Sequence, residues 1–196
     1  MNTQLNFITR RYSKQGLWSL FLLCAFPLHL WTLILTFRDM SWVIERTNLW
    51  DAIGVISYGM VFALAESIIL FVMIALLGLL TPKQWDTDRR VAFLSLLVIL
   101  TGIWGILGQA RYVWEWSLPL PLLQFLAQSD HPFRFLYVMY LAVVVPTVLL
   151  PVYLFLRSKK STQWMKELME RLSTLTVFYL VFDMIGLVIV IVRNLS

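Results

Sequence analysis

Cysteine is nearly absent from this sequence: Cys24 is the only one among 196 residues. A lone cysteine can form neither an intrachain disulfide nor a thiolate metal cluster, so neither device can hold the fold together. Charge is also scarce, because charged residues make up 14% of the chain and hydrophobic residues 60%. A soluble domain is about a quarter charged and roughly half apolar. The composition therefore excludes an ordinary soluble domain and indicates a chain embedded in lipid.

The sequence also lacks the short motifs that mark catalysis or cofactor binding. It contains no HExxH, GxSxG, CxxC, phosphate-binding glycine loop or acidic metal motif. Haem held between two histidines would need His29 and His131, but His131 lies in the polar loop SDHPF. We therefore expect no cofactor and no metal, and the sequence favours a non-enzymatic protein without excluding an enzyme. An intramembrane lipid-handling enzyme is the least favoured alternative.

Five apolar stretches are long enough to cross a bilayer, which takes about 20 apolar residues in a helix. They cover residues 16–37, 53–80, 91–109, 133–156 and 172–192. No alternating pattern typical of strands accompanies them. The sequence predicts an all-α fold, a polytopic helical bundle with about five transmembrane helices in a single domain over residues 1–196. We expect a multi-pass protein of a prokaryotic inner or plasma membrane.

Lysine and arginine are distributed unequally between alternate connections. With the N-terminus in the cytoplasm, the inner side holds eleven basic residues and the outer side holds five. The positive-inside rule then predicts that the N-terminus is inside and the C-terminus outside. The inner residues are Arg10, Arg11, Lys14, Lys83, Arg89, Arg90, Arg157, Lys159, Lys160, Lys166 and Arg171. Because these charges lie between apolar runs, the net charge of +5 indicates topology signals and not a nucleic-acid surface.

Two connecting segments are expected to lie along the membrane surface. The outer one, residues 112–128, mixes Trp, Pro and Leu and is too interrupted to span, which favours an interfacial position. The inner one, residues 157–172, is basic and amphipathic, with Trp164, Leu168 and Leu172 on one helical face. We expect a cytoplasmic surface helix that contacts anionic lipids of the inner leaflet; docking to a partner protein is the alternative. The contact residues would be Lys159, Lys160, Trp164 and Lys166.

Three ionisable residues lie near the middle of predicted spans: His29, Glu66 and Asp183. An acid at that depth costs about 2.5–3.5 kcal/mol on insertion scales unless it finds a partner. Helical spacing places Glu66 on nearly the same side as Gly59, and it places Tyr179 on the same stripe as Asp183. We therefore predict a buried polar seam between the first, second and fifth spans, or a proton or cation path along it. Its members would be His29, Glu66, Ser67, Tyr179 and Asp183.

Small residues recur where helices are expected to approach one another closely. In the second span, Gly59 and Ala63 precede Ser67 at four-residue spacing, the small-xxx-small pattern of close helix pairs. The third span contains three glycines at every third position. We predict helix packing at Gly59, Ala63, Gly102, Gly105 and Gly108.

These observations favour an accessory or structural subunit of a membrane complex. Its partners would be the lipid bilayer, with anionic lipids at the cytoplasmic face, and other membrane subunits or further copies of itself. The alternative is a proton- or cation-linked transporter or channel that uses Glu66 and Asp183, since intramembrane acids favour such a function. A metal site made of these two acids and His29 is stereochemically feasible but has no supporting ligand spacing.

Overall fold

The computed structural model describes residues 12–158 and 160–195 of the chain. Arg10, Arg11 and Lys159, which contribute to the predicted charge bias, lie outside the described residues. The described elements are all helical, in the order α2 (Lys14–Arg46), α3 (Leu49–Leu77), η1 (Gly78–Leu80), α4 (Thr87–Val113), α5 (Leu120–Ala127), α6 (Pro132–Arg157) and α7 (Lys160–Leu195). By length and composition, five of these helices can cross a membrane. The predicted all-α membrane bundle is confirmed at that level.

Polar side chains fix where the long helices begin. The hydroxyl of Ser13 accepts a hydrogen bond from the backbone N–H of Gly16, which caps α2. The side-chain oxygen of Asn48 does the same for α3, and a carboxylate oxygen of Asp86 does so for α4. Each cap satisfies a backbone donor that the first helical turn leaves unpaired. These starts place the chain reversals at Thr47 and at residues 81–86.

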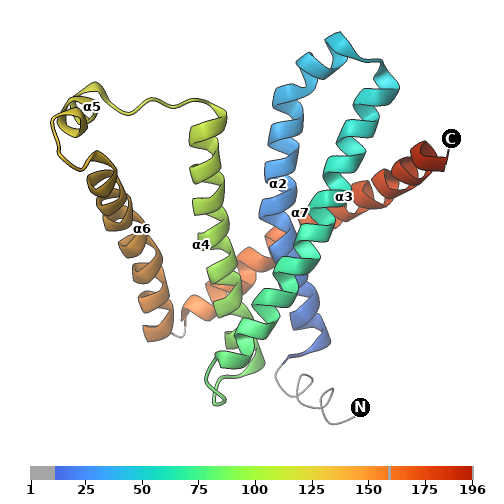
Figure 1. The fold of residues 1–196 in the computed structure, drawn as a ribbon. Helices are drawn as coiled ribbons and strands as arrows, with labels where there is room; N and C mark the ends of the chain where they lie inside the picture. Colours follow the sequence, from blue (N-terminus) through green and yellow to red (C-terminus); the bar gives the residue numbers. More distant parts are fainter. Residues whose placement is uncertain (1–11, 159, 196) are drawn as a thin grey trace.

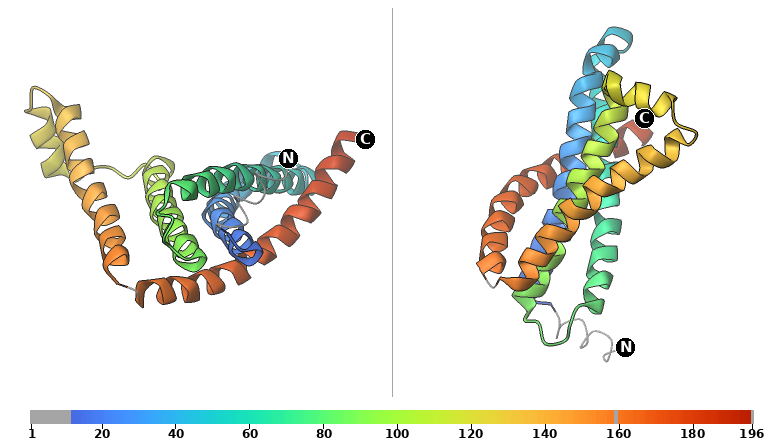
Figure 2. Two further views of the ribbon diagram at one scale, coloured as in Figure 1. Left: turned by 90° about the horizontal axis from the view of Figure 1, so that it is seen from below. Right: turned by 90° about the vertical axis from the view of Figure 1, so that its left-hand side faces the viewer.

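The connections between the long helices lie alternately at two ends of the structure (Figure 1). α2, α3 and α4 pack together, and α7 crosses them obliquely; Figure 2 shows it curving past α4, α2 and α3 in turn. The hydrophobic core lies towards the end at which α2 begins. Its fully buried members include Leu20 and Leu23 of α2, Leu94 of α4 and Met165 of α7.

α7 is one uninterrupted helix of 36 residues. The separate inner surface helix that the sequence suggested is therefore corrected: residues 160–172 form the first turns of the fifth long helix. Met165 and Met169 are buried in the core, and Leu168 and Leu172 pack against it. The apolar face of this segment thus covers other helices of the same chain, while Trp164 is 61% exposed.

Two ion pairs attach α7 to other helices near its two ends. Near its start, the ammonium group of Lys166 donates to the Asp88 carboxylate on α4. Near its end, the Arg193 guanidinium donates to Asp51 Oδ1 at 2.7 Å and to the backbone oxygen of Trp50 at 2.6 Å, both on α3. Lys166, predicted as a lipid contact, is therefore already engaged with an acid of the protein, whereas Lys160 is exposed.

α6 lies apart from the other helices over most of its length (Figures 1 and 2). Of its 26 residues only Phe155 is buried. Near its C-terminal end, the Phe155 ring meets Phe93 at 5.8 Å and Arg89 donates to the backbone oxygen of Leu156 at 2.9 Å. Closer to its start, the Tyr140 ring meets Trp104 of α4 at 5.9 Å. Before it, the predicted outer segment contains the short helix α5; the contact of this segment with a membrane surface stays a prediction.

Candidate functional site

His29 of α2 and Asp183 of α7 form a buried pair. The His29 Nε2 atom lies 2.9 Å from Oδ2 and 3.1 Å from Oδ1 of Asp183. The side chains are 0% and 1% exposed. The other ring nitrogen, Nδ1, lies 2.8 Å from the backbone oxygen of Ala25, one turn earlier in α2. The structure thus brings together two of the three ionisable residues that the sequence placed at membrane depth.

The contacts of His29 fix the number of protons that the pair holds. A backbone carbonyl can only accept, so Nδ1 must carry a hydrogen and donate it to Ala25. One further proton then lies between Nε2 and the Asp183 carboxyl, either as imidazolium and carboxylate or as neutral imidazole and carboxylic acid. The pair has zero net charge in both forms. Burial without a net charge avoids most of the cost that an isolated acid would have.

Tyr179 extends the pair along α7. Its ring lies parallel to the His29 imidazole, with centroids 5.8 Å apart and an interplanar angle of 8°. Phe26 stacks with Tyr179 at 6.4 Å. Gly186, the next small residue on this stripe, allows α7 to reach the α3 backbone: a Cβ atom there would lie 3.3 Å from the backbone oxygen of Ser57. The predicted stripe on the fifth span therefore does face the bundle.

Glu66 does not join this pair. It is exposed, and it forms no hydrogen bond or ion pair within the described part of the chain. Its neighbour Ser67 is fully buried, but the Ser67 hydroxyl donates to Ala63 of the same helix at 2.5 Å. The expected three-helix seam is therefore corrected to a pair between α2 and α7. The reason is helix rotation: α7 packs on the Ser57 face of α3, and Glu66 points along a different face.

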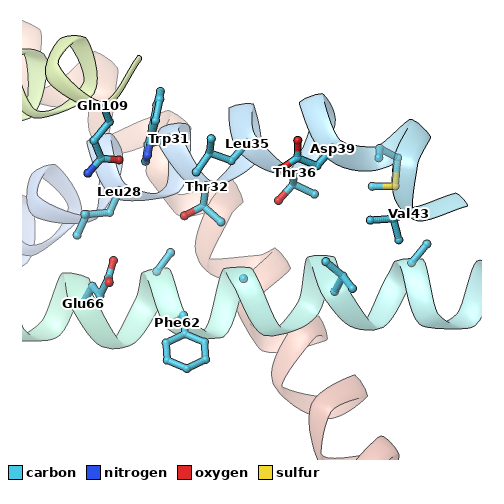
Figure 3. A pocket seen from close by; sticks show the side chains of 15 residues that line it. Leu28, Trp31, Thr32, Leu35, Thr36, Asp39, Val43, Phe62, Glu66 and Gln109 are labelled. Carbon is cyan, nitrogen blue, oxygen red and sulfur yellow. The ribbon is translucent and has the colours of Figure 1, made fainter. Parts of the chain in front are cut away.

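Glu66 instead lines a groove of about 500 Å³ between α2 and α3. Figure 3 shows its carboxyl group reaching towards α2, near Leu28 and Gln109. Along α2, Thr32 and Thr36 continue the polar lining towards the other end of the groove. Sequence reasoning missed this groove. The available signal was the spacing of Thr32, Thr36 and Asp39, at intervals of four and three residues, which places all three on one helical face.

The predicted packing glycines divide into two groups. A Cβ atom at Gly59 would lie 3.3 Å from Thr32 Cγ2, and one at Gly102 would lie 2.9 Å from Pro27 Cβ, so both mark close contacts with α2. Ala63 is also buried. Gly105 and Gly108 face open space within the described structure, so their predicted packing role is corrected.

Among the described residues, no group of three or more His, Cys, Asp or Glu side chains is placed to hold a metal ion. The three residues considered for such a site are separated, because Glu66 lies in the groove and the other two are paired with each other. Comparison of the chain with protein-family models, with curated proteins and with solved structures finds no match.

Proposed function

We propose that this chain is a non-enzymatic subunit of a membrane complex, inserted with its N-terminus in the cytoplasm and its C-terminus outside. The observation that carries the proposal is the sealed pair of His29 and Asp183. Both side chains are inaccessible, at 0% and 1% exposure. The remaining ring nitrogen of His29 is occupied by a backbone carbonyl. Such a contact holds α2 against α7 and specifies which helices pair.

A conducting role for the same residues has less support. A proton path needs each titratable group to reach water or a further titratable group, so that the proton can move on. In the described structure, the contacts of this pair are with each other, with Ala25 and with the Tyr179 ring. Glu66, the second acid of the path considered from the sequence, lies outside it, in the groove.

The position of α6 supports membership of a complex. The most apolar 18-residue stretch of α6 has no buried residue in the described structure, whereas a third of the residues in the corresponding stretches of α2 and α4 are buried. Tyr137, Val138 and Leu149 are each more than half exposed. Lipid can cover such a surface, but a helix with so few buried residues gains a defined position when another protein packs against it.

The test is purification in mild detergent from the native membrane, followed by cross-linking from defined positions. A photoreactive residue at Val138 or Leu149 of α6 should cross-link to a partner protein or to a second copy of the chain. The matched control is the same residue at Ile69 on α3, which is 61% exposed and should label mainly lipid. A chain that migrates alone and labels only lipid from α6 would overturn the subunit proposal. Proton flux that Asp183→Asn abolishes without loss of stability would replace it with the transport alternative.

A further inference from the structure

The groove between α2 and α3 contains an acid without a counter-charge. Its lining residues include Glu66 and Asp39 and no lysine, arginine or histidine. Arg38 already binds Asp39, with Nε 2.6 Å from Oδ1. Glu66 has no such partner in the described structure. An exposed carboxyl group in the middle of an apolar run attracts whatever cation or hydrogen-bond donor can reach it.

A second group in the groove points independently to a ligand. The indole of Trp31 is 9% exposed, yet its Nε1–H has no hydrogen-bond acceptor among the described residues. Figure 3 shows Trp31 beside Gln109, at the end of the groove where Glu66 lies. Buried indole N–H groups nearly always find an acceptor. The groove is therefore lined by both an unused donor and an unused acid.

The threonines along the groove are unusual within this chain. The hydroxyls of Thr101, Thr147, Thr174 and Thr176 each donate to the backbone oxygen four residues earlier. Those of Thr32 and Thr36 form no hydrogen bond within the described structure. One wall of the groove thus offers free hydroxyls. The facing wall, on α3, is apolar apart from Glu66 and includes Ala52, Val55 and Ala63.

The hydrophobic core lies beyond the Glu66 end of the groove. Leu23 and Cys24 of α2 and Leu94 and Val98 of α4 are packed there. Phe71 of α3 packs against the same core. A close-packed apolar core excludes water and small solutes. The groove is therefore suited to hold a ligand rather than to pass one through.

We propose that this groove binds an amphiphilic amine. The ammonium group pairs with the Glu66 carboxylate, an oxygen on the neighbouring carbon accepts from Trp31 Nε1, and the alkyl chain lies against the α3 wall. A long-chain amino alcohol has all three features. The volume of about 500 Å³ is within the range of ligand pockets, roughly 300–1,000 Å³. This site is separate from the His29–Asp183 pair and does not depend on the subunit proposal.

Photolabelling of the full chain in phosphatidylcholine nanodiscs tests the site. The probe is 2-aminododecan-1-ol with a diazirine in its chain, and the labelled peptides are identified by mass spectrometry. Label should appear on α2 and α3 peptides that line the groove. Unlabelled 2-aminododecan-1-ol should compete for it, and dodecan-1-ol should not. Equal competition by the plain alcohol, or label that nothing competes away, would overturn the proposal.

Two variants separate the roles of the acid and the indole. Glu66→Gln should weaken competition by the amino alcohol about tenfold or more, because it removes a charge-assisted hydrogen bond. Glu45→Gln, an exposed acid that does not line the groove, should change nothing. Trp31→Phe should abolish the preference for the amino alcohol over dodecylamine while leaving the affinity for dodecylamine unchanged. An unchanged affinity in Glu66→Gln would overturn the site.

The ammonium group can come from a free amine or from a lipid headgroup, and the same assay distinguishes the two sources. Nanodiscs that contain phosphatidylethanolamine supply a lipid ammonium in place of the free one. Loss of labelling in these discs identifies the lipid as the source, and undiminished labelling identifies the free amine. In both cases Glu66 is the counter-ion if Glu66→Gln lowers labelling in phosphatidylcholine discs. Unchanged labelling of that variant overturns the site.

Discussion

The Nε2 atom of His29 lies 2.9 Å from Oδ2 of Asp183, although the two residues are 154 positions apart in the sequence. Each comes from a helix that is otherwise rich in apolar residues, and each would be costly to bury alone. Together they hold one shared proton, no net charge and a fixed orientation, because Nδ1 is tied to Ala25. The contact joins the first long helix of the chain to the last one.

Asp183→Asn should be tolerated much better than Asp183→Leu. The asparagine amide can donate to Nε2 of a neutral imidazole, so the expected loss of stability is about 0.5–1 kcal/mol. Leucine leaves Nε2 buried without a partner, which costs about 1–3 kcal/mol. The measurement is reversible unfolding in mixed detergent micelles. The double variant His29→Leu with Asp183→Leu should lose less than the two single variants added together. Strict additivity would contradict the pairing.

Gly186→Val should destabilise the protein, whereas Gly105→Ala should not. A Cβ atom at Gly186 would press on the Ser57 backbone at 3.3 Å, and the larger valine side chain would force α7 away from α3. Overpacking of this kind costs about 1–3 kcal/mol. Gly105 faces open space, so alanine there should raise helix propensity by up to about 1 kcal/mol. Thermal unfolding in detergent compares the two; equal losses would contradict the open surroundings of Gly105.

Lys160→Gln and Lys166→Gln should have different effects. Lys160 is exposed, so its loss should weaken attraction to anionic lipid by about 1 kcal/mol. Lys166 donates to Asp88, so its loss should loosen α7 from α4 by up to about 1 kcal/mol, as expected for an exposed ion pair. Lipid cross-linking in vesicles with and without anionic lipid measures the first effect, and thermal unfolding measures the second. A larger lipid effect from Lys166→Gln would reverse this assignment.

Reporter fusions test the proposed orientation. Fusions at Gln84, Ser129, Ser161 and Ser196 should report inside, outside, inside and outside. The physical reason is the excess of Lys and Arg on the side where the chain begins. Replacement of Lys14 by Glu should weaken this preference more than replacement of Arg134, since the first helix usually dominates insertion. Two fusions on the wrong side would contradict the five-span arrangement.

The long helices could be predicted from the sequence because membrane spans depend on apolar length alone. The pairing of His29 with Asp183 could be anticipated from depth, since two polar groups at one level in lipid seek each other. The direction of Glu66 could not, because adjacent helical positions differ by about 100° and the rotation of α3 is set by contacts with its neighbours. The continuity of α7 could have been predicted, because no proline interrupts residues 160–195. The change from basic to apolar composition suggested two separate helices instead.

The groove was harder to infer. Threonines in membrane helices commonly bond to their own backbone, so the sequence does not distinguish Thr32 from Thr101. The difference arises from the local approach of α2 and α3, where Gly59 allows the helices to come close on one side of the groove. Whether the indole N–H of Trp31 finds an acceptor likewise depends on its three-dimensional surroundings, so it cannot be predicted from the sequence.

The uninterrupted course of α7 gives it a mechanical property. A helix of 36 residues is about 54 Å long, and this one is attached near its start at Asp88, towards its middle at His29 and near its end at Asp51. The contact of Asp183 with His29 lies between the other two attachments along α7. Because the attachments to α4 and α3 lie on opposite sides of the His29 contact, a tilt of α7 about His29 would move the Lys166 and Arg193 ends in opposite directions.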